Sequence, residues 1–509
     1  MKVVKIPYQQ TKKFTHLVND YLSRSDNLNN FYNRYPTLEN FSAQWEEKSN
    51  HKIDRKLLVK VLNEQNQLLT LSSLSRCNID SLIEEDSFTV TTGHQLCLFT
   101  GPLYFVYKII STINLTQVLK KKYPEKNFIP VFWMASEDHD FQEVNHVHLF
   151  GQKIEWNSVQ KGAVGRMSLK GIEVVLDDLD KLLGDSVNAK HLSLLFRDAY
   201  LKHNSLAEAT RFLVNALFGK FGLVILDGDD TRLKQQFISI VKKDVLHQGF
   251  FETISKCSQN LAKGYEAQAF VRNINFFHLS NKGRKRLEGE VLESEIDSNP
   301  EDYSPNVLMR PLFQEIVLPN IAYVGGGAEV AYWMQLKTAF DQEQIPFPIL
   351  VLRNSLLWIE QNQVNKWQNL GFELGDLFLD EHQLHQKYVS WQTNLNLTQE
   401  LKNLNKVFEK ILSKTTDKGL QKSVIAEHQR QLNSFKKLEK KLYKSEKKKH
   451  DVALNQITKL KAKLFPNNSL QERFDNFIPF YLKHGDNFIE ILQKELIPLD
   501  AKFVILSPQ

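Results

Sequence analysis

The sequence predicts an α/β fold built on a parallel sheet and followed by a long helical segment. Over residues 87–355, apolar stretches that end in glycine or charged residues alternate with segments of helical periodicity. Beyond about residue 391 glycine and proline become scarce, and apolar residues recur at steps of three and four. The first pattern predicts a Rossmann-like core with inserted connecting segments, and the second predicts a C-terminal α-helical coiled coil.

The first strand–helix–strand unit covers residues 87–136. The stretch SFTVTTGHQ (87–95) is rich in β-branched residues and predicts a strand that ends in a glycine turn. Residues 100–123 predict a helix, with Thr100 as the cap and Pro102 in the first turn. The apolar run NFIPVFWMAS (127–136) predicts a buried strand, so the three segments form a βαβ unit of a parallel sheet.

Later segments repeat this pattern. FGLVILDGDD (221–230) and IPFPILVLRNS (345–355) predict buried strands, and NIAYVGGGAEVAYWMQLKTAF (320–340) predicts a short strand, a glycine turn and a helix. Ligands of such sheets bind outside the carboxyl ends of the strands. We therefore expect these groups on one rim of the sheet: His94, residues 137–140, Asp227, residues 325–327 and Arg353.

The helical segment carries a seam of apolar residues with lysines between them. Leu401, Leu404, Phe408 and Ile411 begin this seam, and TTDKG (415–419) provides a break for a hairpin. DAKFVIL (500–506) predicts a final strand. The expected parts are a core with a helical N-terminal portion (1–385), a coiled coil (386–465) and a segment that returns to the core (466–509).

The composition is that of a globular cytoplasmic protein. Hydrophobic residues make up 42% and charged residues 24%, and neither an apolar leader nor a run of about 18 apolar residues occurs. The three cysteines, Cys77, Cys97 and Cys257, are scattered, which indicates neither a disulfide framework nor a CxxC metal site. Cys97 follows a glycine turn and is either a nucleophile or, more simply, a buried thiol.

Positive charge is concentrated in the helical segment. Residues 401–464 hold 18 Lys/Arg against 6 Asp/Glu, although the whole chain has a net charge of only +6. The lysine run at 435–450 is typical of a solvated helix face. Binding of nucleic acid is the alternative, but basic and aromatic residues do not interleave there and no known binding module accompanies the run.

An acidic cluster directly follows the predicted strand at 127–136. Glu137, Asp138, His139 and Asp140 repel one another and add nothing to a core, so their place at a strand end predicts a function. The carboxylates could hold a transient Mg²⁺ on a nucleotide or act as a base with His139. In a helix, His139 would share a face with Glu143 and His146, which leaves a metal-dependent hydrolase as an alternative.

Two glycine turns could hold an anion. TTGHQ (91–95) can present backbone N–H groups and the His94 imidazole at a helix start, although a simple tight turn explains it nearly as well. GGGAE (325–329) allows a ligand to approach the backbone closely, but it is not a Walker motif.

Four segments carry a resemblance to a known family. TTGHQLCLFTGPLYFVYKIIS, VFWMASEDHDFQEVNH, MRPLFQEIVLPNIAYVGGGAEVAYWMQL and PFPILVLRNS occur in order between residues 91 and 355 and resemble the successive signatures of the bacillithiol synthase family, also called cysteine ligases. The resemblance implies a Rossmann-like core, a homodimer formed through the coiled coil, and the joining of the cysteine carboxyl to the amine of glucosaminyl-malate. Many members have glutamine where this chain has His94, which weakens a catalytic role for that ring. The matching positions are Gly93, Gln95, Gly101, Pro102, Glu137, Asp138, His139, Asp140, Glu143, Asn145, Arg310, Gly325, Gly326, Glu329, Tyr332 and Arg353.

Amide formation from a free carboxylate is uphill in water, so we expect ATP with Mg²⁺ to activate cysteine as an acyl-adenylate or acyl-phosphate. No tightly bound metal or cofactor is expected, and the transient Mg²⁺ would lie at Asp138 and Asp140. A coiled-coil scaffold that binds RNA or an acidic partner is a further alternative. The assigned residues are: catalytic, Glu137, Asp138, His139 and Asp140; substrate-binding, His94, Gln95, Asn145, Arg310, Glu329, Tyr332 and Arg353; nucleotide-binding, Gly93, Gly325, Gly326 and Gly327.

Overall fold

The computed structural model describes residues 1–280, 283–288, 291–393 and 397–507. The chain forms two compact units. We call residues 5–356 and 471–504 the α/β unit, and residues 1–4, 357–470 and 505–509 the helical unit. Residues 394–396 of the predicted coiled coil and 508–509 of the predicted final segment lie outside the described residues.

A parallel sheet forms the centre of the α/β unit, as the sequence predicts. Its five strands lie in the order β11–β10–β2–β3–β6, and every neighbouring pair is parallel. Numbered along the chain and read from the β6 edge, this is the order 3-2-1-4-5 of a Rossmann-like sheet. The strand order reverses direction between β2 and β10. The strands are β2 (Ser87–His94), β3 (Asn127–Met134), β6 (Val224–Asp227), β10 (Asn320–Gly325) and β11 (Ile349–Leu352).

The register brings the carboxyl ends of the strands level with one another. His94 at the end of β2 lies opposite Met134 of β3, which in turn lies opposite Asp227 of β6. On the other side of the reversal, Gly325 ends β10 opposite Leu352 of β11. Residues that follow these strands therefore meet at one edge of the sheet.

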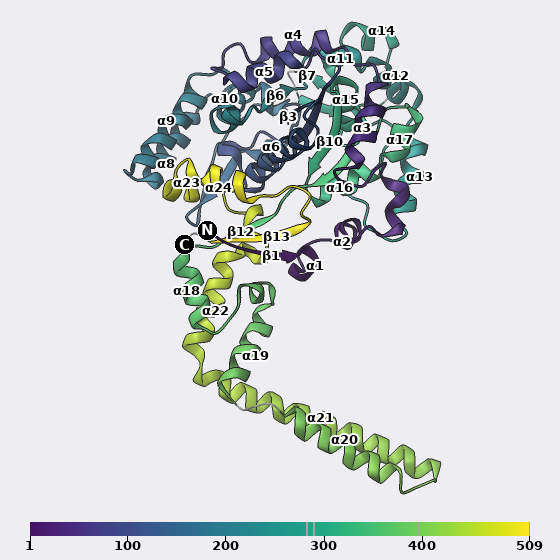
Figure 1. Ribbon diagram of the computed structural model, residues 1–509, viewed down its shortest axis with the longest axis vertical. Helices are drawn as coiled ribbons and strands as arrows, with labels where there is room; N and C mark the ends of the chain where they lie inside the picture. The colour runs from purple at the N-terminus through teal and green to yellow at the C-terminus, as the bar shows by residue number, and fades with distance from the viewer. Residues whose placement is uncertain (281–282, 289–290, 394–396, 508–509) are drawn as a thin grey trace. The chain divides into compact units, whose positions relative to one another are not determined.

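Both faces of the sheet are covered, as a parallel sheet requires. The helix α6 (Tyr104–Lys122) lies along the sheet and is buried along most of its length (Figure 1). Alternate residues of β3 face opposite layers: Phe128 packs with Phe88 of β2, whereas Val131 packs with Leu226 of β6 and the opposite core. Continuous apolar strands thus follow from burial on both sides.

The start of α6 differs from the sequence prediction. The helix begins at Tyr104, and Thr100 is no cap, because its φ is +70°. The side chain of Asn476 donates to the carbonyl oxygens of Phe99 at 2.9 Å and of Gly101 at 2.6 Å. A tertiary contact from the C-terminal segment therefore sets the turn before the helix.

The other elements of the α/β unit surround the sheet or form insertions between its strands. Two small antiparallel sheets, β4–β5 and β8–β7–β9, belong to these insertions. The expected helix over 327–340 is broken into α16 and α17 at Gln335 and Leu336. The elements are α1 (Tyr8–Thr11), α2 (His16–Leu22), α3 (Asn40–Ser49), α4 (Arg55–Gln65), α5 (Ser73–Ser81), α7 (Phe141–Val144), β4 (His146–Leu149), β5 (Gln152–Glu155), α8 (Ile172–Leu183), α9 (Val187–Leu201), α10 (Leu206–Phe218), α11 (Thr231–Gln236), α12 (Ile238–His247), α13 (Phe251–Leu261), β7 (Phe276–Ser280), β8 (Gly283–Arg286), α14 (Glu293–Ser298), β9 (Tyr303–Pro305), α15 (Arg310–Val317), α16 (Gly327–Met334), α17 (Lys337–Gln342), α23 (Ile478–His484) and α24 (Asn487–Glu495).

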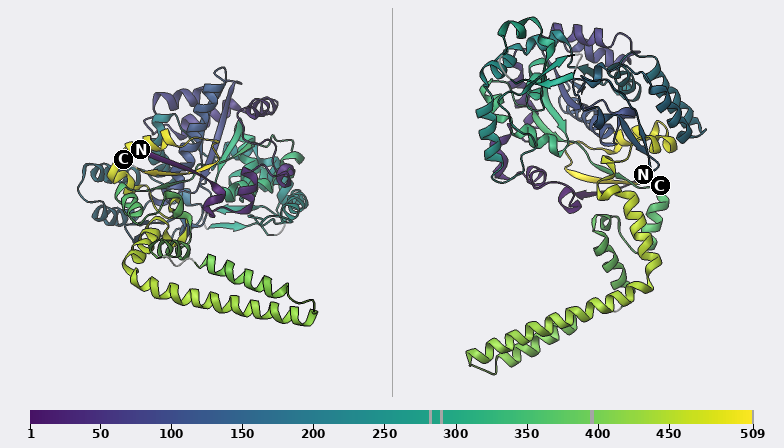
Figure 2. Two further views of the ribbon diagram at one scale, coloured as in Figure 1. Left: turned by 60° about the horizontal axis from the view of Figure 1, so that its bottom comes forward. Right: turned by 180° about the vertical axis from the view of Figure 1, so that it is seen from behind.

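A long helical hairpin dominates the helical unit. The helices α20 and α21 run side by side (Figure 2), and the turn at 413–417 between them overlaps the predicted break. The ring of Phe408 stacks on His428, with the ring centroids 4.6 Å apart. The elements of this unit are α18 (Gln361–Asn369), α19 (Glu381–Gln392), α20 (Thr398–Leu412), α21 (Lys418–Lys449) and α22 (Asp451–Leu464).

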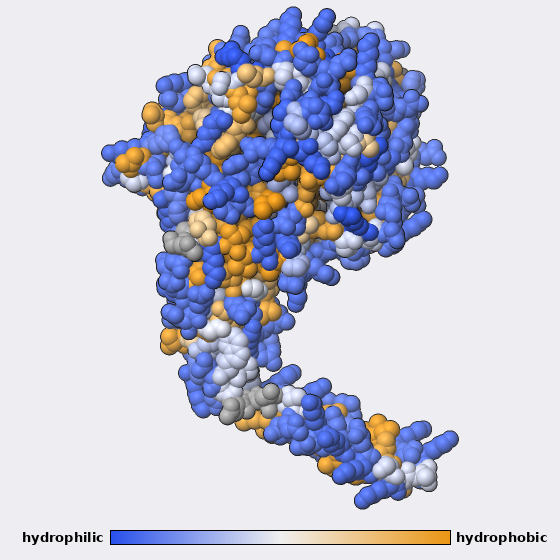
Figure 3. All heavy atoms as spheres, in the orientation of Figure 1, coloured by the Kyte–Doolittle hydropathy of each residue, from blue (hydrophilic) through white to orange (hydrophobic). Residues whose placement is uncertain are grey.

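The hairpin exposes apolar side chains. In the part of α20 and α21 that is described, no residue is buried, whereas α19 and α22 bury Leu384, Val389, Leu454 and Ile457. Figure 3 shows the hairpin surface as mostly hydrophilic with separate hydrophobic side chains. The exposed large apolar residues of the hairpin are Val407, Ile411, Leu420, Ile425, Leu438 and Leu442.

The chain ends meet in a small sheet of order β1–β13–β12. Its strands are β1 (Lys2–Pro7), β12 (Leu356–Trp358) and β13 (Lys502–Ser507), and β13 is the strand predicted near the C-terminus. Within the described ranges, no helix is both long enough and apolar enough to cross a membrane.

Candidate functional site

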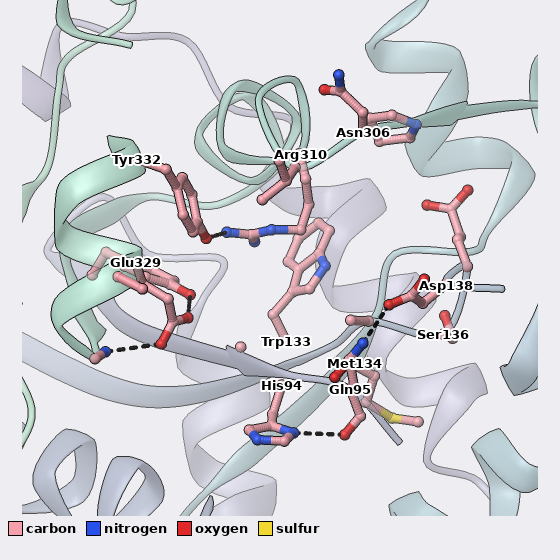
Figure 4. Close-up of a pocket in the computed structure, with 18 of the residues that line it drawn as sticks. His94, Gln95, Trp133, Met134, Ser136, Asp138, Asn306, Arg310, Glu329 and Tyr332 are labelled. Carbon is pink, nitrogen blue, oxygen red and sulfur yellow. Dashed lines mark hydrogen bonds between the residues drawn. The ribbon is translucent and has the colours of Figure 1, made fainter. Parts of the chain in front are cut away.

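A pocket of about 680 Å³ opens at the carboxyl ends of the strands, where the strand order reverses between β2 and β10 (Figure 4). A cavity therefore lies at the predicted rim, and part of the rim lines it. The lining residues contributed by strand ends and the turns after them are Gly93, His94, Gln95, Trp133, Met134, Ala135, Ser136, Glu137, Asp138, Tyr323, Gly326, Gly327, Ala328, Glu329 and Arg353.

The pocket walls carry more cations than anions. Seven basic side chains line it, against the three carboxylates of Glu137, Asp138 and Glu329. Sequence reasoning identified only Arg310 and Arg353 among these cations, because the others lie on helices, hairpins and loops outside the assigned motif residues. An excess of cations in a cavity favours anionic ligands. The basic residues are Lys108, Arg272, Arg284, Arg286, Arg310, Arg353 and Arg473.

Asp138 presents an ionised carboxylate to the pocket. Gln95 Nε2 donates to Asp138 Oδ2 at 2.6 Å and to Glu143 Oε2 at 2.8 Å, so one amide joins two acids. Burial alone would raise the pKa of Asp138, but the hydrogen bonds from Gln95 and from the backbone N–H of His139, together with Arg284, hold that pKa below its usual value. This carboxylate can therefore receive a positively charged group of a ligand.

Glu137 turns toward the protein interior. Lys234 Nζ lies 2.6 Å from Glu137 Oε1 and 3.1 Å from Asp229 Oδ1, and the Lys234 side chain is almost fully buried. Burial raises the pKa of Glu137, although Lys234 opposes that effect. The Lys234 ammonium thus compensates Glu137 of the acidic cluster together with Asp229.

His139 and Asp140 lie beside the pocket and do not line it. His139 Nδ1 is 3.2 Å from Arg284 Nη1 and 3.5 Å from Asp138 Oδ1. A guanidinium can only donate and a carboxylate can only accept, so Nδ1 lies between a donor on Arg284 and an acceptor on Asp138. The Asp140 side chain is exposed, and its backbone N–H donates to Asp138 Oδ1 at 3.4 Å.

Glu329 holds the glycine turn in place. Its Oε2 accepts from the Gly326 N–H at 2.8 Å, and its Oε1 accepts from the Tyr323 hydroxyl at 2.6 Å and from Lys108 Nζ at 2.9 Å. Burial would raise the pKa of Glu329, but Lys108 and these hydrogen bonds lower it. Lys108 also donates to the Gly93 carbonyl and so joins the turn after β10 to the end of β2.

The three glycines after β10 serve close packing. A Cβ on Gly325 would lie 2.9 Å from Glu329 Cβ, and one on Gly327 would lie 2.7 Å from Val18 Cγ2. A Cβ on Gly326 would have Glu329 Oε2 at 3.5 Å and Arg353 Nε at 3.7 Å as its nearest neighbours, so this position keeps the most open space of the three. Gly326 and Gly327 line the pocket at the N-terminus of α16, whereas Gly325 does not.

Arg310 faces the pocket without a carboxylate partner. It donates from Nη1 to Gln314 Oε1 at 3.0 Å and from Nη2 to the Tyr332 hydroxyl at 3.4 Å (Figure 4). Its guanidinium carbon lies 5.4 Å from the centre of the Tyr323 ring. Within the described residues, no carboxylate lies within ion-pair distance of Arg310, so its charge is available to an anionic ligand.

Arg353, by contrast, is already paired. Its Nη2 donates to Glu472 Oε1 at 2.7 Å, and its guanidinium carbon lies 5.3 Å from the centre of the Tyr104 ring. Its Nη1 donates to the Ser355 hydroxyl at 3.1 Å. Its Nε is buried and has no protein partner in the part of the chain that is described. Arg353 therefore reaches the pocket as a neutralised group.

His94 is a neutral ring at the pocket wall. Burial, with Lys108 nearby, lowers the pKa of His94 to about 4. Its Nδ1 lies 2.8 Å from the Gln95 carbonyl oxygen, which can only accept, so the proton is on Nδ1 and Nε2 carries a lone pair. Burial raises the pKa of Cys97 to about 12, which favours the reading of Cys97 as a buried thiol.

Asn145, which was assigned to substrate binding, and Asp227, which was expected on the rim, also lie outside the pocket lining. Asn145 is buried and donates from Nδ2 to the Trp156 carbonyl at 3.2 Å, which ties together the insertion that follows β3. Asp227 ends β6 and accepts from the Ser136 hydroxyl, so it supports the turn that carries the acidic cluster.

The geometry required for a metal-dependent hydrolase is missing. The helix α7 spans only Phe141–Val144, so His139 precedes it and His146 belongs to β4. The three side chains do not share a helix face, and the described residues contain no group of three His, Cys, Asp or Glu side chains placed to hold a metal ion. That alternative finds no support, and neither does the scaffold alternative.

Comparison with known proteins covers the whole chain. Residues 1–354 match the family model for the N-terminal Rossmann-like domain of bacillithiol biosynthesis BshC, and residues 356–508 match the model for its C-terminal coiled-coil domain. Proteins named "Putative cysteine ligase BshC" are similar along their full length: that of Flavobacterium psychrophilum is 43% identical and that of Flavobacterium johnsoniae 42%, each with 99% of both chains covered. The protein of that name from Cytophaga hutchinsonii is 36% identical over 97% of both chains.

These matches confirm the predicted Rossmann-like core, the predicted coiled coil and the resemblance drawn from the four segments. The sheet order and the helical hairpin agree with the two domain descriptions. The chain belongs to the BshC family of bacillithiol biosynthesis.

Proposed function

We propose that the protein is a ligase that joins the carboxyl group of cysteine to the amine of glucosaminyl-malate and so forms the amide bond of bacillithiol. Membership of the family supports the reaction. The observation that carries the assignment to this pocket is that its walls hold both an unneutralised cation, Arg310, and an ionised carboxylate, Asp138. A substrate with malate carboxylates and an amine needs both charges.

The malate moiety would bind at Arg310. Its carboxylates can accept the guanidinium donors that are not used by Gln314 and Tyr332. The exposed Arg473 and the hairpin residue Arg286 line the same pocket and could neutralise the second carboxylate. Glu329, which is saturated by protein donors, would hold the turn rather than the substrate.

The amine would lie at Asp138, beside Gln95. An ammonium is attracted to the ionised carboxylate, but only the neutral amine attacks a carboxyl carbon, so one proton must leave. For His139 to accept it at Nδ1, the ring must leave its contact with Arg284, whose Nη1 lies 3.2 Å away. His94 offers a bare Nε2 on the pocket wall, although its low pKa makes it a weak base.

Activation of the cysteine carboxyl would require ATP and Mg²⁺. The helix α16 begins at the pocket with Gly327 and Ala328. Their backbone N–H groups could bind phosphate oxygens, helped by the helix dipole. Of the two residues predicted to hold Mg²⁺, Asp138 lines the pocket and Asp140 does not. When bound, the nucleotide would supply the free energy of the amide bond, while Asp138 and Arg310 orient the acceptor.

A homodimer formed through the hairpin is part of this proposal. The α20–α21 hairpin exposes large apolar side chains and, among its described residues, buries none, which leaves apolar surface for a second copy.

The direct test is to incubate the purified protein with cysteine, glucosaminyl-malate and ATP–Mg²⁺ and to detect the thiol product by mass spectrometry. We expect product only when all components are present. Product formed without nucleotide would remove the activation step. No product with any nucleoside triphosphate would contradict the proposed ligase.

A further inference from the structure

A buried chain of hydrogen bonds runs from the interior of the α/β unit to Arg310. Arg310 and Gln314 lie one turn apart on α15, and Arg310 Nη1 donates to Gln314 Oε1 at 3.0 Å. Gln314 Nε2 in turn donates to Glu315 Oε1 at 2.9 Å. Gln314 and Glu315 are both completely buried.

Glu315 fixes the direction of this chain. Its Oε2 lies 3.2 Å from the fully buried Lys48 Nζ, which also donates to the Glu315 carbonyl at 2.7 Å. Its Oε1 also accepts from Asn320 Nδ2 at 2.6 Å. Each polar contact of the Glu315 carboxylate is therefore with a donor.

A guanidinium can only donate, so Gln314 must present its carbonyl oxygen to Arg310, which leaves its NH₂ group for Glu315. The opposite orientation of the amide would place two acceptors together at Glu315 and two donors together at Arg310. Both arrangements cost free energy in a buried setting. The sheet anchors the chain further, since the hydroxyls of Thr89 and Thr91 donate to Asn320 Oδ1 at 3.1 and 2.8 Å.

We infer that Gln314 is a positioning residue for the substrate-binding guanidinium of Arg310, and that Glu315 and Lys48 fix the amide of Gln314 in the orientation that does this. The inference rests on the proposed function, in which Arg310 binds a malate carboxylate. A neutral amide holds the guanidinium without cancelling its charge. A carboxylate at position 314 would neutralise Arg310 and would also face the carboxylate of Glu315.

The test measures kinetics and binding for Gln314→Met, which keeps the side-chain length but removes the acceptor. We expect the KM for glucosaminyl-malate to rise about tenfold, the typical effect of losing one hydrogen bond to a charged group, with kcat changed less than about twofold. Calorimetric binding of glucosaminyl-malate without cysteine should weaken by the same factor. In an Arg310→Met background, Gln314→Met should add less than about twofold, because it acts through Arg310.

Gln44 provides a matched control. It is also completely buried, and its Oε1 accepts from an arginine, Arg34, at 3.0 Å, but it does not line the pocket. Gln44→Met should lower the melting temperature without changing the KM. If Gln314→Met fails to fold, Gln314→Asn keeps a buried amide but shortens the side chain by one methylene, so its oxygen no longer reaches Arg310 and the KM should again rise about tenfold.

An unchanged KM in the Gln314 variants would overturn this inference and leave the proposed function standing. So would an effect of Gln314→Met on the KM that is equal with and without Arg310. If the wild-type protein fails to bind glucosaminyl-malate in the calorimeter, the proposed function falls and the inference falls with it. The two failures are therefore distinguishable.

Discussion

Arg353 at the end of β11 donates to Glu472 across 2.7 Å, although the two residues lie 119 positions apart in the sequence. Glu472 is completely buried, and it also accepts from the Ser355 hydroxyl at 3.1 Å and from the Leu356 N–H at 3.0 Å. The segment after the helical unit thus returns to the sheet and supplies the anion for Arg353. Its next residue, Arg473, lines the pocket.

We predict that Glu472→Gln lowers the free energy of unfolding by about 3 kcal/mol, because it leaves the buried Arg353 guanidinium without a counter-charge. Chemical denaturation followed by fluorescence measures this. Glu490→Gln is the control: its carboxylate is 56% exposed and pairs with Lys220, so its loss should cost less than about 1 kcal/mol. Equal effects of the two substitutions would show that the Arg353 pair does not stabilise the fold.

A second prediction separates two neighbouring acids. Asp138 lines the pocket and Asp140 is exposed beside it. Asp138→Asn should therefore reduce kcat/KM for ligation by at least about a hundredfold, whereas Asp140→Asn should retain activity within about threefold. Similar losses in both variants would contradict the placement of the acceptor amine at Asp138.

Much of the fold could be predicted from local sequence. The strands β2, β3, β10 and β11 are apolar runs that end in glycine or charge, and burial on both faces of a parallel sheet leaves this pattern in any chain. The start of α6 was predicted wrongly, because Asn476, more than 350 residues away, sets the turn before it. Contacts of that separation leave no local signal.

The site was predictable only in part, for the same reason. Gln95, Asp138 and Gly326 follow predicted strand ends and line the pocket, as expected for a switch point of the sheet. Lys108 was missed because a single lysine in an apolar helix has many explanations. Arg473 was missed because nothing local shows that its segment folds back onto the sheet.

The neutral His94 makes a third prediction, about pH. Its pKa is about 4 in the folded protein and 6.5 is the ordinary value, so the unfolded chain binds more protons between these limits. Stability contributed by this group is therefore complete above pH 6.5 and is lost as the pH falls toward 4. Between pH 7.5 and pH 4, the free energy of unfolding of the wild-type protein should fall by about 3 kcal/mol more than that of His94→Gln.

Denaturation midpoints of both proteins across this range measure the difference, and the values at pH 7.5 serve as the reference. Parallel curves for the two proteins would contradict the burial of a neutral ring. The same variant tests catalysis: if His94 contributes only hydrogen bonds, glutamine should keep kcat within about threefold, whereas loss of a general base would cost about a hundredfold or more.

The last prediction concerns the hairpin. Leu438 and Leu442 lie one turn apart on α21 and are exposed. In a symmetric dimer each substitution acts twice, and burial of a leucine contributes about 1.5–3 kcal/mol, so Leu438→Glu with Leu442→Glu should weaken dimerisation by at least about a hundredfold. Sedimentation velocity over a range of concentrations measures the change, with circular dichroism to check that the helices remain. The control adds the same two charges at the exposed pair Gln429 and Asn433, which bond to each other at 3.2 Å, and it should sediment as wild type. A wild-type protein that stays monomeric at all concentrations would show that the hairpin folds on itself and leaves its apolar residues to solvent.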